Sequence, residues 1–373
     1  MKKKFNIFVV LTLIISVFLM PNFALANDEE YNFGYLPSPA VGIPNSLPDV
    51  YQSYGLPAAV DLSQYVGPIK DQESDPWCVA YGVTTAVEAQ MRLQGMAVPE
   101  GGFSIAWLYA RCKQLDGVPS VRGTYIFTAL EIAKNEGLCP ESLCPTPPYK
   151  NQKDENLPKL TPAMAEAAAQ YKIESYKRLL DPLGYADMQE TKAALAAGHF
   201  VILASYVEQS WNKEYKGWLL EPWGYIRGGH CVVLDGYDDT QVYSDYTGFF
   251  DGPNSWGDWW GQSGYFEMSY NYANWRDLSV GMPMVLEAYT IDLMGQDPQV
   301  NFVEMPIPLQ IINPGYTVLP FRVVFEALGG TVDWGFNSQG KIWVRGTVEL
   351  KYETVTLEMV QGDPQLKVIH NLN

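Results

Sequence analysis

Residues 71–91 read DQESDPWCVAYGVTTAVEAQM, a polar loop that runs directly into a helical pattern with a cysteine at the junction. Apolar and small side chains recur at helical spacing from Val79 to Met91, and Gly95 supplies a C-terminal stop. Cys78 therefore stands at the N-terminal end of the predicted helix, where the positive end of the helix dipole stabilises a thiolate. The alternative, a buried structural cysteine, accounts for neither Gln72 nor the helix.

Two later segments complete a set of groups with one chemistry, GGH at residues 228–230 and NSWG at residues 254–257. A thiol, an imidazole and an amide that orients it are the parts of cysteine-nucleophile acyl transfer. In that interpretation the Cys78 thiol attacks a carbonyl, His230 carries the proton and the Asn254 oxygen fixes the tautomer. Gln72 and the backbone N–H of Cys78 stabilise the oxyanion.

From about Leu56 to Asn274 the chain resembles the papain-like cysteine peptidases, in particular their secreted bacterial members. The matching segments are residues 56–62 (LPAAVDL), 68–72 (PIKDQ), 137–142 (GLCPES), 228–238 (GGHCVVLDGYD) and 254–265 (NSWGDWWGQSGY). The resemblance implies an α+β, papain-like fold of two subdomains, a helical half with Cys78 and a β-barrel-like half with His230 and Asn254. It also makes Gln72 the oxyanion donor. Both His230 and Asn254 follow the cysteine at more than the roughly 130–150 residues usual for the family, which indicates inserted loops.

The stretch before the nucleophile departs from the family pattern. Asp75 stands where a disulfide cysteine usually sits, so we expect that bridge to be absent. Pro76 and Trp77 replace small residues beside the thiol, and Val79 replaces the usual Trp. Gly229 replaces an acidic residue before the histidine. These changes predict an altered cleft width and pH profile without the loss of a catalytic group.

Four residues are predicted to line the substrate site: Trp77, Gly229, Trp256 and Trp260. The resemblance implies that Trp256 and Trp260 shield the His–Asn pair and form the floor of the leaving-group side, while plain core packing is the alternative. Of the other two histidines, His199 precedes a buried strand and His370 has no cysteine or acidic cluster beside it. His230 is thus the predicted base.

The N-terminus has the pattern of an export signal. Lys2, Lys3 and Lys4 precede an apolar run from Phe5 to Met20, and a small-x-small cleavage site ends at Ala26. The run is short for a membrane anchor, which is the alternative. We expect a secreted or envelope-associated, extracellular protein with no transmembrane anchor after cleavage. The chain holds 25 Lys and Arg against 42 Asp and Glu, which disfavours nucleic acid and anionic membrane as partners.

Five cysteines are an odd number for an exported chain. Besides Cys78, Cys231 lies in a buried-strand pattern and is interpreted as a small core residue. At most one disulfide is then expected, among Cys112, Cys139 and Cys144, and spacing does not choose the pair. No histidine lies near these three, so neither a metal site nor a cofactor is predicted.

The order of elements is helices first and strands later. Helices are predicted over 103–114, 124–135, 161–169 and 192–197, and strands over 200–205, 231–236 and 264–268, with a Gly/Trp-rich loop between the last two. We predict a signal peptide over 1–26, an extended leader or short propeptide over 27–55, a peptidase domain over 56–288 and a second domain over 289–373. The long helical propeptide usual in the family is absent, so the hypothesis is that activity is restrained in a different way, or only by this short arm lying in or near the cleft.

Residues 318–334 (VLPFRVVFEALGGTVDW) resemble the centre of the copper amine oxidase N-terminal-like domain, a small module beside varied enzymes exported by Gram-positive bacteria. A helix over 321–328 and strands over 341–345 and 355–359 fit the local pattern. Copper is not expected, because a lone His370 is not a copper site. The module is interpreted as a stalk that contacts the cell envelope.

The sequence therefore predicts a secreted cysteine endopeptidase that hydrolyses peptide bonds of protein or peptide substrates through a thioester. Two alternatives stay open. One is transpeptidase- or transglutaminase-type acyl transfer on envelope proteins, which Pro76 and Trp77 could assist by excluding water. The other is a catalytically silent module that binds peptide or cell wall.

Overall fold

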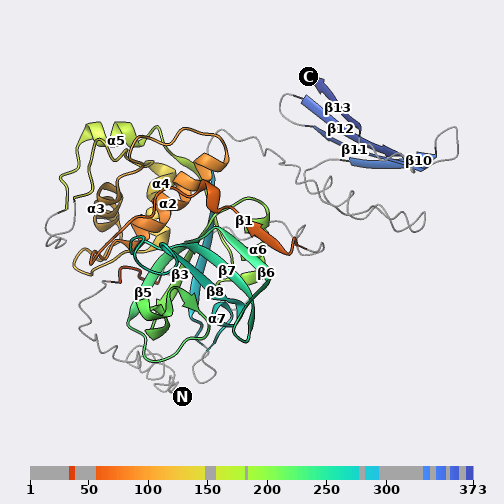
Figure 1. Ribbon diagram of the computed structural model, residues 1–373. Helices are drawn as coiled ribbons and strands as arrows, with labels where there is room; N and C mark the ends of the chain where they lie inside the picture. The colour runs from red at the N-terminus through yellow and green to blue at the C-terminus, as the bar shows by residue number, and fades with distance from the viewer. Residues whose placement is uncertain are drawn as a thin grey trace, which may run out of the picture.

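The computed structural model describes residues 33–37, 56–147, 157–180, 184–276 and 282–293, and the backbone of four strands between 331 and 372 (Figure 1). The predicted signal segment, most of the leader and the predicted helix over 321–328 lie outside these residues. Within the described part, no helix is both long enough and apolar enough to cross a membrane.

The helical half is built on α2 (Cys78–Leu93), with α3 (Ile105–Leu115), α4 (Ile126–Asn135) and α5 (Pro162–Ala168). The predicted helices in this half are confirmed, with ends shifted by one or two residues. The shifts follow the caps: the Ser104 hydroxyl accepts from the Trp107 N–H, and the Thr161 hydroxyl accepts from the Met164 N–H. Figure 1 shows these helices gathered on one side of the peptidase unit, with the strands on the other.

A four-stranded antiparallel sheet backs the helices, in the order β2-β9-β3-β5. Its strands are β2 (Ile173–Arg178), β9 (Val285–Leu293), β3 (Val201–Val207) and β5 (Gly228–Leu234). Strand β9 crosses the predicted domain boundary at 288 and pairs as far as Leu293 with Ile173. The peptidase unit therefore extends at least five residues beyond that prediction, because β9 is an internal strand of its sheet.

A second sheet has the order β1-β6-β7-β8-β4. It contains β1 (Ala59–Asp61), β6 (Gly236–Tyr243), β7 (Tyr246–Pro253), β8 (Tyr265–Ser269) and β4 (Trp218–Leu219). The hairpin β6–β7 occupies a region that the sequence predicted as loop, which is a correction. The predicted strand over 231–236 is in fact two, because β5 ends at Leu234 and β6 begins at Gly236. Short helices α6 (Met188–Ala196) and α7 (Tyr270–Ala273) flank the strands. The first begins four residues before the predicted helix, since the Asp187 carboxylate accepts from the N–H groups of Gln189 and Glu190.

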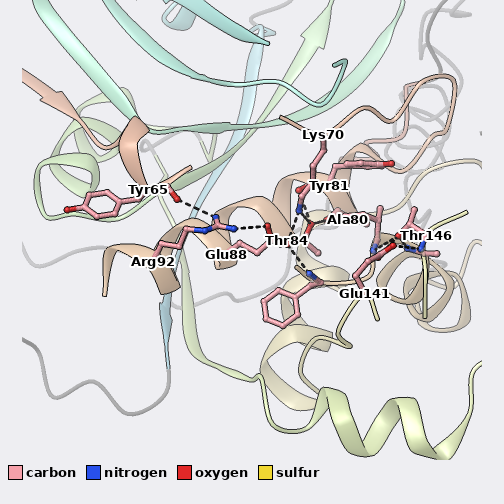
Figure 2. Close-up of polar contacts among 12 residues, drawn as sticks. Tyr65, Lys70, Ala80, Tyr81, Thr84, Glu88, Arg92, Glu141 and Thr146 are labelled. Carbon is pink, nitrogen blue, oxygen red and sulfur yellow. Dashed lines mark hydrogen bonds and ion pairs between the residues drawn. The ribbon is translucent and has the colours of Figure 1, made fainter. Parts of the chain in front are cut away.

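A buried carboxylate fixes the loop before the nucleophile to α2 (Figure 2). Glu88 is 4% exposed, and its Oε1 accepts from Lys70 Nζ at 2.9 Å and from the Phe103 N–H at 2.9 Å. Lys70 also donates to the Thr84 hydroxyl at 3.2 Å, and Arg92 lies 3.7 Å from Glu88 Oε2. Since a buried charge must be paired, these contacts hold the Lys70 segment in one position against the helix.

The C-terminal strands form a separate antiparallel sheet in the order β10-β11-β12-β13. Their bounds are Thr331–Phe336, Ile342–Glu349, Glu353–Val360 and Lys367–Leu372. The strands predicted over 341–345 and 355–359 are confirmed as parts of β11 and β12. The identity of the module as a stalk stays a prediction.

Candidate active site

The Cys78 thiol lies at the first residue of α2, where strand β5 packs against the helix, and it is fully buried. Burial raises the pKa of this thiol to about 11. Backbone N–H groups of Cys231, Gly34, Val79 and Cys78 itself face the sulfur and lower its pKa, by less than burial raises it. The contact with Cys231 brings the sulfur to the residue that follows His230.

His230 and Asn254 form the hydrogen bond that the sequence predicts, with 2.8 Å between Nε2 and Oδ1. Asn254 Oδ1 also accepts from the Ser255 N–H at 2.7 Å, so this atom acts as an acceptor and His230 Nε2 donates to it. Nδ1 is then the basic nitrogen, and it has no hydrogen-bond partner within the described residues. Burial lowers the pKa of His230 to about 4, while the bond to Asn254 opposes that shift.

Three tryptophans enclose this pair. Trp256 stacks on the His230 ring at 4.7 Å, and Trp211 meets the same ring edge-on at 5.8 Å. Trp260 packs edge-on against Trp256 at 5.1 Å. All three side chains are fully buried, so they form a wall behind the imidazole rather than an open surface for substrate. Trp211 was missed by the sequence analysis because no motif marks it.

Gln72 is buried between the two halves. Its Nε2 donates to the Asp75 carbonyl at 2.8 Å, its Oε1 accepts from the Ser255 hydroxyl at 2.5 Å, and its own N–H donates to the Ser255 carbonyl at 2.7 Å. The Gly257 N–H donates to the Lys70 carbonyl at 3.0 Å. The loop that carries Gln72 is therefore attached directly to the loop that carries Asn254.

Trp77 lies beside the nucleophile in sequence but not in the cleft. Its ring is 2% exposed and stacks on Tyr109 at 5.1 Å, in the core of the helical half. The Tyr109 hydroxyl in turn accepts from the Gly123 N–H at 2.9 Å. The Trp77 ring is therefore buried in the helical half, and its contact with substrate stays a prediction.

The leader segment Phe33–Pro37 lies across the site in an extended conformation. The Tyr35 N–H donates to the Gly229 carbonyl at 3.1 Å, on strand β5 of the histidine half. On the helical side, the Thr124 N–H donates to the Gly34 carbonyl at 2.8 Å, and the Leu36 N–H donates to the Thr124 carbonyl at 2.9 Å. The segment therefore pairs with both halves at once, as a strand lying parallel to residue 124.

The Tyr35 side chain fills a pocket beside Gly229 and is 4% exposed. A Cβ at Gly229 would lie 2.6 Å from the Tyr35 ring, so glycine makes room for this side chain. Burial raises the pKa of Tyr35, and the nearby Glu287 carboxylate raises it further. Glu287 itself is buried, 3.4 Å from Arg178 and bonded to the Tyr289 hydroxyl at 2.9 Å. No sequence pattern indicated this pocket, because its members come from the leader, β5 and β9.

The structure also describes the remaining cysteines and histidines. All five cysteines are free and buried, so the disulfide that the sequence allowed among Cys112, Cys139 and Cys144 does not form. Cys231 is 1% exposed in β5, as predicted for a core residue. His199 Nδ1 lies 3.3 Å from the Ile291 carbonyl, and His370 lies in β13. Among the residues that the structure describes, no group of three or more His, Cys, Asp or Glu side chains could hold a metal ion.

Residues 56–283 match the model of the papain family cysteine proteases. Because the match spans more than half of the chain, this protein belongs to that family. The two-subdomain fold agrees with this assignment, with helices in one half and antiparallel sheets in the other.

Comparison with solved structures supports the fold. Xylellain, a cysteine protease from Xylella fastidiosa, is 24% identical with a TM-score of 0.58, over 70% of this chain and 96% of that one. The proCathepsin B S9 from Trypanosoma congolense is 17% identical with a TM-score of 0.54, over 70% and 87%. A curated relative, gamete and mating-type specific protein A of Dictyostelium discoideum, is 26% identical over 219 residues. That match covers 58% of this chain and 43% of the relative, so the chain spans less than half of its length.

Proposed function

We propose that this chain is an exported cysteine endopeptidase that hydrolyses peptide bonds through a thioester on Cys78. The observation that carries the proposal is the bond between His230 Nε2 and Asn254 Oδ1 at 2.8 Å, beside a sulfur that contacts the next residue, Cys231. This arrangement leaves Nδ1 of the imidazole available as the base. The predicted export signal supports secretion.

In the proposed reaction the Cys78 thiol passes its proton to His230 Nδ1, and the sulfur attacks the peptide carbonyl. The oxyanion is held by the Cys78 N–H and the Gln72 amide, in a site closed to water by Trp211 and Trp256. The imidazolium then protonates the leaving amine, which leaves an acyl group on sulfur. His230 next activates a water molecule, and hydrolysis of the thioester restores the thiol.

We further propose that the leader, predicted over 27–55, holds the enzyme latent. Phe33–Pro37 uses backbone groups of both cleft walls, those of Gly229 and Thr124, that an extended substrate would need. Its presence also keeps water from the Cys78–His230 pair, and burial favours the neutral forms of both groups. The C-terminal sheet is proposed as an appendage that contacts the cell envelope.

The test is a peptide-library cleavage assay on the chain with and without residues 27–55, combined with labelling by an epoxide thiol inhibitor. We expect cleavage without the leader, and a loss of roughly three orders of magnitude or more in kcat/KM for Cys78→Ala and His230→Ala. His199→Ala is the control histidine variant and should keep its activity. Unchanged turnover in both active-site variants would exclude the mechanism.

The same assay separates the alternatives. Amide products formed with an added amine, in place of free acids, would indicate transpeptidase- or transglutaminase-type acyl transfer. A chain without the leader that neither cleaves peptides nor reacts with the epoxide would be a binding module. A reactive thiolate is the property that only the enzymatic readings require.

A further inference from the structure

A buried lysine holds one wall of the cleft. Lys113, in the last turn of α3, has a side chain that is 5% exposed. Its Nζ donates to Asp116 Oδ2 at 2.8 Å and to the carbonyls of Val118 at 2.9 Å, Val121 at 2.7 Å and Gly123 at 2.9 Å. The ammonium group has three N–H bonds for four oxygens, so the contacts enclose it. We call these five residues the Lys113 cage.

Asp116 completes the cage from the helix end. Its side chain is fully buried, its Oδ1 accepts from the Val118 N–H at 3.0 Å, and its Oδ2 accepts from the Thr124 hydroxyl at 3.1 Å. One ion pair therefore fixes both the start and the end of the loop over 117–124. All five cysteines of the chain are free, so this loop has no disulfide to hold it.

The end of this loop is the edge on which the leader lies. Gly123 has a φ of +88°, and a Cβ there would lie 2.3 Å from the Gly34 carbonyl oxygen, so the two backbones are in close contact. The next residue, Thr124, makes the paired backbone bonds to Gly34 and Leu36. The Gly123 carbonyl is bound by Lys113 and its N–H by the Tyr109 hydroxyl.

We propose that Lys113 is a positioning residue for substrate binding, because its cage holds the Gly123–Thr124 backbone at the spacing that an extended peptide in the cleft requires. The inference rests on the proposed function, since the leader is taken to mark where a substrate backbone lies. Lysine suits this role because its ammonium donors can turn toward several carbonyls. The planar guanidinium of arginine has a fixed fork of donors, and methionine has no donor at all.

The test compares Lys113→Met with Arg111→Met in the full chain. Arg111 lies on the same helix and pairs with Glu136 outside the cage, so its variant removes a cation of α3 without touching the loop. Hydrogen exchange at the Thr124 and Leu36 amides should be at least about tenfold faster in Lys113→Met, and unchanged in Arg111→Met. Amides within α2 should exchange at the same rate in both variants. If the Thr124 and Leu36 amides of Lys113→Met exchange at the same rate as those of the parent chain, the proposal is overturned.

Kinetics of the same variants without residues 27–55 test the role in binding. We expect Lys113→Met to raise KM for short peptides by about tenfold with kcat within about twofold, because the cage contacts the binding edge and not the reacting atoms. A general structural weakening would lower kcat and the melting temperature together, and would count against positioning.

If Lys113→Met does not fold, Asp116→Asn keeps the three carbonyl bonds and should give a smaller effect in the same direction. An exchange rate at Thr124 in Asp116→Asn equal to that of the parent chain would then overturn the proposal. If no form of the chain hydrolyses peptides, the proposed function fails, while the exchange of Thr124 and Leu36 still decides whether the cage holds this edge.

Discussion

Gly34 is the residue at which the leader meets the nucleophile. Its N–H faces the Cys78 sulfur, and a Cβ there would lie 1.8 Å from the Pro76 carbonyl oxygen. That neighbour is backbone and cannot move aside as a flexible side chain could. The fit of the leader therefore depends on a single missing methyl group.

Gly34→Ala should displace the leader from the thiol. In the parent chain the pKa of Cys78 is raised to about 11 and that of His230 lowered to about 4, so both groups are neutral between these values. Alkylation of Cys78 should then be slow from pH 5 to 8 and rise only at alkaline pH, since the thiolate is the reactive form. In Gly34→Ala we expect at least about tenfold faster alkylation at pH 7, as a drop of one pKa unit gives tenfold more thiolate.

Pro37→Ala is the matched control, because Pro37 belongs to the same segment but is exposed. It should label at the parent rate. Equal labelling of Gly34→Ala and the parent chain would show that the leader does not protect the thiol.

The sequence predicted the residues that carry a motif and missed those that only geometry brings together. Gln72, Cys78, His230 and Asn254 stand in recognisable segments: His230 bonds to Asn254, Gln72 bonds to Ser255 beside Asn254, and the Cys78 sulfur contacts Cys231 beside His230. Trp211 belongs to no motif, and its place against the His230 ring depends on how a loop folds back. The burial of the Trp77 ring against Tyr109 was not predicted, because sequence adjacency to the thiol does not give the direction of a side chain.

At the scale of elements, the second sheet carries a row of carboxyl groups across neighbouring strands. In the strand register, Asp61 of β1 lies opposite Gly236 of β6, and Gly236 lies opposite Asp251 of β7. Asp251 in turn lies opposite Glu267 of β8. Asp235 is fully buried beside this row, and burial, together with the charges of Asp251 and Asp61, raises the pKa of its carboxyl group. Tyr265, on β8, faces the same acids. Like charges on adjacent strands destabilise a sheet unless they are neutralised.

This row predicts that the peptidase unit is more stable at acid pH. Burial raises the pKa of both Asp251 and Glu267 to about 7, and neighbouring acids add to the shift. The folded state therefore binds these protons more tightly than the unfolded state, so stability falls as the pH rises from about 4 to about 7. Asp235→Asn replaces one acid of this group, whose own pKa is raised, with a neutral amide, and should reduce that fall by on the order of 2 kcal/mol.

The measurement is thermal unfolding of Asp235→Asn and the parent chain from pH 4 to 8. Asp245→Asn serves as the control, because Asp245 is exposed at the turn between β6 and β7. Its profile should follow that of the parent chain. Parallel profiles for Asp235→Asn and the parent would show that the Asp235 carboxyl does not contribute to the pH dependence of stability.

Helices were easier to predict than strands for a physical reason. The hydrophobic periodicity of α2, α3 and α4 can be recognised from residues close together in sequence. Strands β6 and β7 combine a polar outer surface with a turn, so apolar and polar residues alternate only weakly in them. Strand β9 carries Glu287 in its middle, which breaks the apolar run, and the structure accommodates that charge with Arg178. Pairing between distant strands cannot be derived from either segment alone.

At the scale of the whole molecule, the last strand of the peptidase unit, β9, completes the four-stranded sheet. β9 lies between β2 and β3, and its residues from Val285 to Leu293 are nearly all buried. The helical half and the histidine half both pack against this sheet. The sequence predicted the two halves correctly but placed the domain boundary inside this strand, because the composition of the chain changes past about Tyr289.

Truncation should therefore show a sharp threshold. A chain that ends at Leu293 should fold, whereas a chain that ends at residue 284 should not. The shorter chain lacks β9, so the inner edges of β2 and β3 are unpaired and several core side chains are missing. Circular dichroism and thermal unfolding of the two chains are the measurements. A cooperative transition in the shorter chain would show that β9 is dispensable.

The position of β9 has a consequence for biosynthesis. The nucleophile is made early and the histidine later, but the strand that aligns the sheet behind them leaves the ribosome last of all in this unit. The active-site groove therefore cannot be complete before β9 has been synthesised. The Phe33–Pro37 segment is translated much earlier, so it is present when the groove forms. If the leader holds the enzyme latent as proposed, the order of translation ensures that the complete site never forms before the segment that covers it has been made.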